Sequence, residues 1–370
     1  MASVLVTGGA GFIGSHLVDA LLERGHRVRV VDALIEQVHG SKRPTLPADV
    51  ELLEGDVRNR GLVDRALEGI EVVYHEAAEV GVGQSMYEIE RYVGGNNMAT
   101  ATLLEALIER RGQVRKLVVA SSMSIYGEGA YATAAGEIVA PQLRPTSQLE
   151  ARDWELRHPE TGEALAPAPT PETKPLYPSS IYAITKQDQE QMCLVIGRAY
   201  GIPTVALRYF NVYGTRQALS NPYTGVAAIF SGRLLNKQRP LIFEDGLQSR
   251  DFTHVSGIVQ ANVKAMDSPR ADFQAINVGT GTATPIAAVA ELLARGLGLD
   301  LEPEIVSRYR EGDIRHCYAD ISRARDLLGY EPTVTLEQGI PQLLEWVAQQ
   351  HAEDAVARAT DELKSRGLVR

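Results

Sequence analysis

Tyr182 and Lys186 stand four residues apart in the segment Tyr-Ala-Ile-Thr-Lys. On an α-helix this spacing places both side chains on one face, one turn apart. A Lys ammonium group beside a phenol stabilises the phenolate and lowers the tyrosine pKa from about 10 towards the working pH. Such a tyrosine can take a proton from a hydroxyl group while hydride leaves the same carbon. Because Tyr-x-x-x-Lys occurs by chance in many helices, the pair gains weight only from the elements around it.

Ser122 is a second candidate for the same chemistry. It follows the apolar run Lys116–Ala120, which predicts a buried strand that delivers Ser121 and Ser122 at its C-terminal end. Ligands of open parallel sheets bind beyond the C-terminal ends of the strands. We therefore expect Ser122 to face a ligand site.

The N-terminus predicts a dinucleotide-binding unit that would position these residues. An apolar run at Ser3–Thr7 leads into a glycine-rich turn and then into a helical pattern that ends at Gly25. Backbone N–H groups and the helix dipole at such a helix start suit a pyrophosphate. The spacing G-x-x-G-x-x-G differs from the commoner G-x-G-x-x-G, and a plain tight turn is the alternative. The candidate cofactor contacts in the turn are Gly8, Gly11, Phe12, Ile13 and Gly14.

Asp32 ends a second predicted strand, Arg27–Val31. A carboxylate there accepts hydrogen bonds from an adenosine ribose and repels a 2′-phosphate, so we expect NAD rather than NADP. Taken alone, Asp32 could also be a turn residue. Further strands are predicted at Val50–Leu53 and Val72–His75, and a long helix at 87–111. They provide five more candidate cofactor contacts: Asp56, Val57, Ala77, Ala78 and Asn97.

Length and composition limit the classes of protein. With 370 residues the chain can form one large α/β domain or two small ones. No apolar run approaches the ~20 residues of a membrane span, and the N-terminus enters a strand without a leader pattern. Only two cysteines are present, which favours a cytoplasmic location. The formal net charge of −10 argues against nucleic acid as a partner but does not exclude an anionic small ligand.

Together these residues resemble the extended short-chain dehydrogenase/reductase superfamily, in particular its nucleotide-sugar epimerase and dehydratase families. The matching segments span nearly the whole chain in the family's order: TGGAGFIG at 7–14, SSMSIYG at 121–127, YAITK at 182–186, RYFNVYG at 208–214, SRDFTHV at 249–255 and REGD at 310–313. The resemblance implies an α/β fold with a Rossmann-type doubly wound parallel sheet, bound NAD and a smaller C-terminal substrate-binding lobe. We expect the NAD-binding domain at 1–220, the lobe mainly at 221–350 and a tail at 351–370.

The resemblance also assigns roles. Tyr182 would be the acid/base, Lys186 its electrostatic partner, and Ser122 would hydrogen-bond the reacting hydroxyl. The 4,6-dehydratases of the family carry Asp and Glu after this serine, and the related decarboxylases keep the Glu. Here Met123 and Ser124 stand there, and neither can act as a carboxylic acid. Elimination thus lacks an obvious catalyst, which favours a 4-epimerase with tightly held NAD.

The substrate contacts are also carried over by resemblance. The expected contacts are Ser122, Ser124, Asn211, Arg250, Arg310 and Asp313. A guanidinium is well suited to phosphate oxygens, although each arginine taken singly could be a surface ion-pair partner.

The segment between the serine-rich and Tyr-x-x-x-Lys motifs is longer than the family usually has, so we expect an insert at 128–177. It is rich in Pro and charge, with Trp154 as its one large apolar anchor. Two similar stretches, 132–141 and 158–167, suggest two small hairpins, with coincidence as the alternative. Suitable donors other than His158 are missing where a zinc ribbon would have cysteines, so we expect no metal. An insert of this length is more often a lid or an interface than a linker.

The segment 78–93 and the insert look most like the dTDP-L-rhamnose 4-epimerase group, which makes dTDP-6-deoxy-L-talose. A UDP-glucose or UDP-N-acetylglucosamine 4-epimerase is the alternative within the class. A nucleotide-sugar oxidoreductase, a 4,6-dehydratase and a non-catalytic nucleotide-binding protein are alternatives from other classes. By resemblance the helix at 87–111 and the helix carrying Tyr182 would pair in a homodimer, and no membrane partner is expected.

Overall fold

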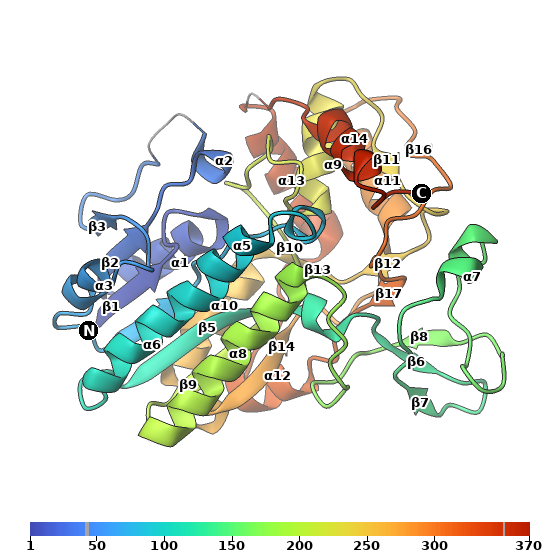
Figure 1. Ribbon diagram of the computed structural model, residues 1–370. Helices are drawn as coiled ribbons and strands as arrows, with labels where there is room; N and C mark the ends of the chain where they lie inside the picture. The colour runs from blue at the N-terminus through green and yellow to red at the C-terminus, as the bar shows by residue number, and fades with distance from the viewer. Residues whose placement is uncertain (41–43, 351) are drawn as a thin grey trace.

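The computed structural model describes residues 1–40, 44–350 and 352–370. Its centre is a seven-stranded parallel sheet with the strand order β14-β9-β5-β4-β1-β2-β3 (Figure 1). The strands are β1 (Ser3–Thr7), β2 (Arg27–Asp32), β3 (Glu51–Glu54), β4 (Val72–His75), β5 (Lys116–Ser122), β9 (Thr204–Tyr209) and β14 (Gln274–Val278). This sheet confirms the expected Rossmann-type α/β fold.

Each face of the sheet carries its own hydrophobic core, because successive side chains of a strand point to opposite faces. Val4 and Val6 of β1 belong to one core, and Leu5 between them belongs to the other. The first face is covered by α1 (Phe12–Glu23), α10 (Val255–Asp267) and α12 (Ser322–Leu328). The opposite face, towards the viewer in Figure 1, is covered by α3 (Arg60–Ala66), α6 (Ala99–Glu109) and α8 (Ile181–Tyr200). The sheet is thus wound on both sides.

Sequence patterns also predict a strand at Pro203–Leu207, so six of the seven strands are predicted, but β14 is not. This strand pairs with β9, and α10 before it packs on α1. Residues 255–278 therefore belong to the Rossmann layers although they follow residue 220. The smaller lobe is built from separated stretches of 221–350 rather than from one continuous segment.

The smaller lobe has its own core between three helices: α9 (Val226–Leu235), α11 (Ile286–Gly296) and α13 (Leu336–Val347). The sequence predicts a closing helix at Leu336–Val347, and the helix α13 has these bounds. Its N-terminus is fixed by a capping box between Thr335 and Gln338. Short strands complete the lobe: β10 (Asn211–Tyr213) with β13 (Phe252–His254), β11 (Leu241–Ile242) with β16 (Glu304–Ile305), and β12 (Ser249–Arg250) between β15 (Thr284–Pro285) and β17 (His316–Cys317).

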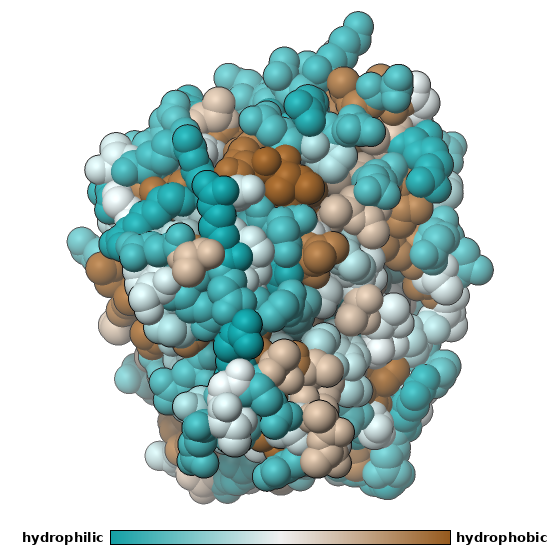
Figure 2. Space-filling model, turned by 90° about the vertical axis from the view of Figure 1, so that its right-hand side faces the viewer, coloured by the Kyte–Doolittle hydropathy of each residue, from teal (hydrophilic) through white to brown (hydrophobic). Residues whose placement is uncertain are grey.

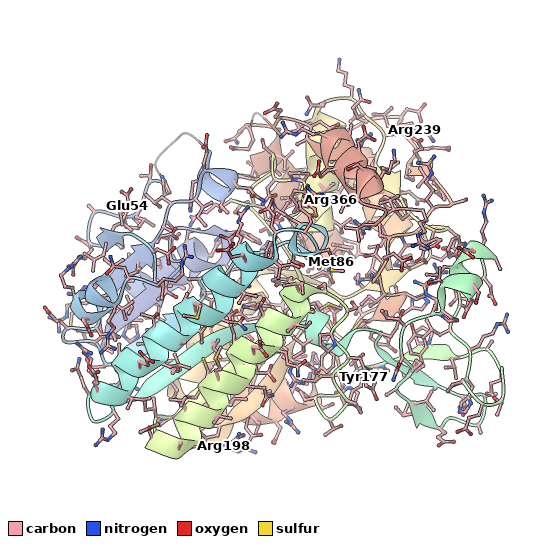
Figure 3. The ribbon with its side chains drawn as sticks, in the orientation of Figure 1. Glu54, Met86, Tyr177, Arg198, Arg239 and Arg366 are labelled. Carbon is pink, nitrogen blue, oxygen red and sulfur yellow. The ribbon has the colours of Figure 1, made fainter. Side chains whose placement is uncertain are left out.

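The C-terminal tail folds back onto the molecule. Its helix α14 (Val356–Ser365) places Leu363 against Gly83, and the Arg366 guanidinium lies 4.2 Å from the ring centre of Tyr87. Figure 3 labels Arg366 next to this helix. Within the described part of the chain, no helix combines the length and the apolar character that a bilayer crossing requires.

The insert at 128–177 forms a small sheet beside the lobe. Its strands are β6 (Ala130–Ala132), β7 (Ile138–Val139) and β8 (Ala166–Ala168), with the helix α7 (Thr146–Glu150) between β7 and β8. The first expected hairpin is the β6–β7 pair, and the second is the bridge between Arg157 and Ala164. Figure 2 shows this side of the molecule, where hydrophilic residues predominate and apolar residues form small separate groups.

Trp154 is only half-buried, so it is not the anchor of the insert that the sequence suggested. The buried apolar cluster of the insert consists instead of Tyr131, Leu156 and Leu165. Tyr131 and Leu165 lie on or beside paired strands, which explains why a three-stranded sheet rather than one tryptophan holds the insert together.

Candidate active site

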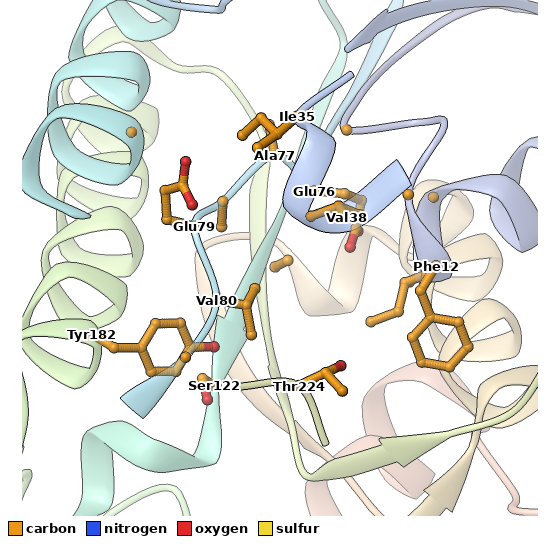
Figure 4. Close-up of a pocket in the computed structure, with 18 of the residues that line it drawn as sticks. Phe12, Ile35, Val38, Glu76, Ala77, Glu79, Val80, Ser122, Tyr182 and Thr224 are labelled. Carbon is orange, nitrogen blue, oxygen red and sulfur yellow. The ribbon is translucent and has the colours of Figure 1, made fainter. Parts of the chain in front are cut away.

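A cavity of about 760 Å³ opens at the C-terminal edge of the sheet, between the Rossmann layers and the smaller lobe. Figure 4 shows Tyr182 and Ser122 at one end and Phe12 and Thr224 on the opposite wall. The cavity brings together most residues predicted from the sequence: Gly8, Gly11, Phe12, Ile13, Gly14, Asp32, Asp56, Val57, Ala77, Ala78, Ser122, Ser124, Tyr182, Lys186 and Asn211.

The glycine-rich turn leaves no room for side chains. A Cβ atom on Gly14 would lie 2.2 Å from the carbonyl oxygen of Gly8, and one on Gly8 would lie 2.8 Å from the backbone of Ala77. Gly8 also has a φ of +71°, which disfavours other residues. The helix α1 begins at Phe12, so its first N–H groups face the cavity beside this turn. This cradle suits a pyrophosphate group.

Asp32 ends β2 on the wall of the cavity and is 8% exposed. Its carboxylate accepts hydrogen bonds from the backbone N–H groups of Ala10 (3.0 Å) and Leu34 (2.9 Å). A carboxylate has about four acceptor positions, so capacity remains for ribose hydroxyls. Asp32 thus also holds the glycine-rich turn in place, a role that the sequence does not reveal.

Asp56 and Val57 line the same end of the cavity. The Arg58 guanidinium bonds both carboxylate oxygens of Asp56, and these bonds hold the pKa of Asp56 below its usual value. Ile35 and Val38, beside and on the short helix α2 (Glu36–His39), add apolar side chains to the cavity wall (Figure 4). An apolar wall with an ionised carboxylate suits a purine ring with an amino group.

Tyr182 and Lys186 are held by α8, whose N-terminus is capped by the Ser180 side chain. The backbone N–H of Tyr182 donates to the Ser85 hydroxyl at 3.0 Å. Burial raises the pKa of Tyr182, and the hydrogen bond with Ser122 opposes the rise. From the sequence, Lys186 is expected to lower the pKa of Tyr182, but in the structure burial dominates and the pKa of Tyr182 is raised.

Ser122 ends β5 and has two contacts in the turn that follows it, η2 (Met123–Tyr126). Its hydroxyl oxygen accepts hydrogen bonds from the backbone N–H of Ser124 (3.2 Å) and from the Ser124 hydroxyl (2.9 Å). Ser124 therefore orients Ser122 as well as lining the cavity. Met123 lines the cavity too. The position directly after Ser122, where a dehydratase would carry a carboxyl group, therefore presents a thioether to the cavity.

Asn97 does not line the cavity. Its amide donates to Asp188 at 2.6 Å, so the structure does not support the expected cofactor contact. The neighbouring Asn96 is fully buried and holds the loop after β4, accepting from the N–H of Glu79 (2.7 Å) and donating to the Thr185 hydroxyl (2.9 Å). The shift arises in η1 (Val93–Met98), where the helix has the wider π-type turn, which sequence periodicity does not reveal.

Three of the expected substrate contacts also lie outside this cavity. Arg250 donates to the backbone carbonyls of Ser249, Ile314 and Arg315. Arg310 pairs with Asp313 at 2.7 Å. In this structure these groups hold the 313–316 segment, and their expected contact with a diphosphate remains a prediction.

Sequence reasoning missed Glu76, which follows β4 and lines the cavity. Its carboxylate accepts a hydrogen bond from the Tyr209 hydroxyl at 2.9 Å. The sequence does contain a signal for Glu76: it is an ionisable residue that lies between the end of the predicted strand Val72–His75 and the expected cofactor contact Ala77.

The fold and cavity define a Rossmann-type enzyme with a dinucleotide site next to a Ser–Tyr–Lys cluster. The profile of the family described as "NAD dependent epimerase/dehydratase family" matches residues 4–148 and 159–279. The unmatched residues 149–158 fall in the insert. The chain belongs to this family and is an NAD-dependent enzyme of the epimerase type.

Relatives and solved structures agree with this membership. The dTDP-L-rhamnose 4-epimerase of Burkholderia thailandensis is 36% identical over 351 residues, covering 94% of this chain and 95% of that protein. A putative UDP-glucose 4-epimerase of Methanocaldococcus jannaschii is 33% identical, covering 93% and 98%. The structure of the Thermotoga maritima UDP-glucose 4-epimerase with UDP-glucose is similar with a TM-score of 0.77 and 32% identity, covering 94% and 99%. The cofactor of the chain is NAD, for which the glycine cradle and Asp32 provide the fitting groups.

Proposed function

We propose that the chain is a nucleotide-sugar 4-epimerase that converts dTDP-L-rhamnose to dTDP-6-deoxy-L-talose. The observation that carries the reaction type is the cluster of Ser122, Tyr182 and Lys186 in one cavity, with Met123 and Ser124 where an elimination would use carboxyl groups. The 36% identical dTDP-L-rhamnose 4-epimerase supports the choice of substrate.

In the proposed reaction, bound NAD supplies a reversible hydride acceptor for the sugar C4. Tyr182 takes the proton of the C4 hydroxyl and later returns it to the ketone oxygen. Ser122 holds that oxygen by a hydrogen bond, since its hydroxyl and the Tyr182 side chain line the same cavity. Lys186, one helical turn from Tyr182, stabilises the phenolate by its charge. The ketone turns over in the pocket between the two proton transfers, which inverts C4.

Proton NMR of dTDP-L-rhamnose with the purified protein and no added cofactor tests this proposal. A new anomeric signal that grows to a constant ratio is the expected result. Tyr182→Phe provides the matched control and should leave the spectrum unchanged. A persistent keto-sugar product would instead indicate a dehydratase or an oxidoreductase and would refute epimerisation.

UDP-glucose is the second candidate substrate, because the Thermotoga maritima structure with UDP-glucose is similar over 94% of this chain. The same NMR experiment with UDP-glucose separates the two. Conversion of UDP-glucose without conversion of dTDP-L-rhamnose would exclude the first substrate, and conversion of neither would refute both.

We also propose a homodimer in a reducing compartment such as the cytoplasm. Exposed apolar residues follow one another along the helical segments expected to pair: Ile89, Val93 and Met98 before α6, and Ile184 and Val195 on α8. Both cysteines are free and buried. Sedimentation analysis at several concentrations tests the dimer.

A further inference from the structure

Glu76 is an ionisable group of the cavity wall that the proposed reaction does not use. It follows β4, which lies beside β5 in the sheet, and β5 lies beside β9. At the same edge Ser122 of β5 is the paired neighbour of Tyr209 of β9. Glu76, Ser122, Tyr209 and Lys186 all line one cavity, and Figure 4 shows Glu76 and Tyr182 on its walls.

The partners of Glu76 carry no charge. The Tyr209 hydroxyl donates to Glu76 at 2.9 Å and accepts from the Asn262 amide at 2.7 Å. These bonds fix the position of the carboxylate without neutralising it. Among the residues that the structure describes, no cation lies within ion-pair distance of Glu76.

Lys186 is a buried positive charge that likewise lacks a charged partner within ion-pair distance. It is 3% exposed, and it makes no hydrogen bond or ion pair with any residue in the described part of the chain. Glu190 is a second nearby carboxylate, but Arg208 binds both of its oxygens at 2.6 and 2.9 Å. The charge of Glu190 is therefore already matched, and Glu76 is the carboxylate whose charge remains available to Lys186.

We propose that Glu76 is a positioning residue of the active site whose carboxylate supplies the counter-charge that keeps Lys186 an ammonium ion. This inference rests on the proposed function, in which the charge of Lys186 stabilises the phenolate of Tyr182. Without the counter-charge, a buried ammonium ion is disfavoured and loses its proton more readily.

The direction of the pKa shifts agrees with this role. Burial lowers the pKa of Lys186 to about 8, and the charge of Glu76 opposes that fall. Burial raises the pKa of Glu76 to about 7, and the bond from Tyr209 and the charge of Lys186 oppose that rise. The other titratable groups that face this pair are Tyr74, His75, Tyr182, Glu190, Cys193 and Tyr209. Of these, His75 is neutral near pH 7, since burial lowers its pKa to about 3.

The test measures the pKa of Lys186 directly in the NAD-bound enzyme. The chain has only seven lysines, so ¹³C NMR with lysine labelled at Cε gives few signals, and Lys186→Arg identifies the one from Lys186. In Glu76→Gln the pKa of Lys186 should fall by about one unit, because a neighbouring negative charge is lost. The alkaline limb of the kcat profile should move down in pH by the same amount.

Glu79→Gln is the matched control, since Glu79 also lines the cavity but is paired with Arg91 at 2.7 Å. It should leave the Lys186 titration unchanged, and Glu76→Asp should keep it near the wild-type value. An unchanged Lys186 pKa in Glu76→Gln would overturn the inference. If the wild type does not epimerise any substrate but Glu76→Gln still lowers the Lys186 pKa, the proposed function fails and the electrostatic inference stands.

Discussion

Two of the regions that bury charged side chains, the cavity and the junction of the insert, pair these charges differently. In the cavity, Lys186 has no ion-pair partner among the described residues, and Glu76 is bonded only by the neutral Tyr209. At the insert junction, where the insert meets residues 244–245 and 313–316, Arg144 binds both carboxylate oxygens of Glu244 (2.7 and 3.0 Å).

The remaining charges of the insert junction are matched in the same way. Arg315 is fully buried and donates to Glu155, Glu244 and Asp245. Glu128 accepts from the backbone N–H of Arg315 at 2.8 Å. Buried charges that are paired with opposite charges hold two parts of a fold together, whereas buried charges without such a pair are available to a ligand. The contrast between the two regions predicts which substitutions damage the chemistry and which damage the fold.

Tyr182→Phe gives the largest expected effect on chemistry with the smallest on structure. It removes only the hydroxyl that transfers the proton, so kcat should fall by about 10³-fold, which corresponds to ~4 kcal/mol. Bound NAD, measured after release by denaturation, and the free energy of unfolding should stay near the wild-type values. Retained turnover would remove Tyr182 from its proposed role, and a large loss of stability would contradict the contrast.

Arg144→Met should show the opposite pattern. The Arg144 and Glu244 side chains are 2% and 4% exposed, so the substitution leaves a buried carboxylate without its main partner. The free energy of unfolding in urea should fall by about 3–5 kcal/mol, while kcat per folded molecule stays within about twofold. The double variant Arg144→Met/Glu244→Met removes both charges and should be more stable than the single variant. A single variant as stable as the wild type would show that the insert junction does not hold the insert.

The sequence predicts features that depend on neighbouring residues and misses features that depend on contacts between distant parts of the chain. The strand, glycine-rich turn and helix at the N-terminus follow from local spacing. The sequence did not predict β14, because its place in the sheet depends on pairing with β9 across the fold. It gave no sign that Arg315 would be buried, because the three carboxylates that its side chain binds come from distant parts of the chain and leave no local pattern. The sequence did not single out the buried Asn96, because the π-type turn shifts the helical phase there.

Asp32→Ala tests a cavity residue that has two roles: its carboxylate faces the expected nucleotide, and it also holds the glycine-rich turn. Loss of the carboxylate should raise the share of NADP bound from an equimolar mixture with NAD by about tenfold, or ~1.4 kcal/mol, because the repulsion of a 2′-phosphate is removed. It should also lower stability by about 1 kcal/mol, because the N–H of Ala10 loses its acceptor. Asp56→Ala, in which the removed carboxylate is already paired with Arg58, is the control and should leave the nucleotide ratio unchanged. An unaltered ratio in Asp32→Ala would mean that Asp32 does not select NAD.

The adjacent pair Asn96 and Asn97 gives the smallest and most local test. Asn96 fixes the backbone of Glu79, which lies between Ala78 and Val80 on the cavity wall, and it also bonds Thr185 next to Lys186. Asn96→Ala should therefore lower both NAD retention and kcat by about tenfold, since truncating a buried hydrogen-bonding side chain costs about 1–3 kcal/mol.

Asn97 is half-buried and bonds only Asp188 in the described structure. Asn97→Ala should change NAD retention by less than about twofold, because a partly exposed pair contributes little. The reverse result would place Asn97 at the cofactor, as the sequence alone suggested, and would mean that the helix carries its polar face one residue further along when NAD is bound.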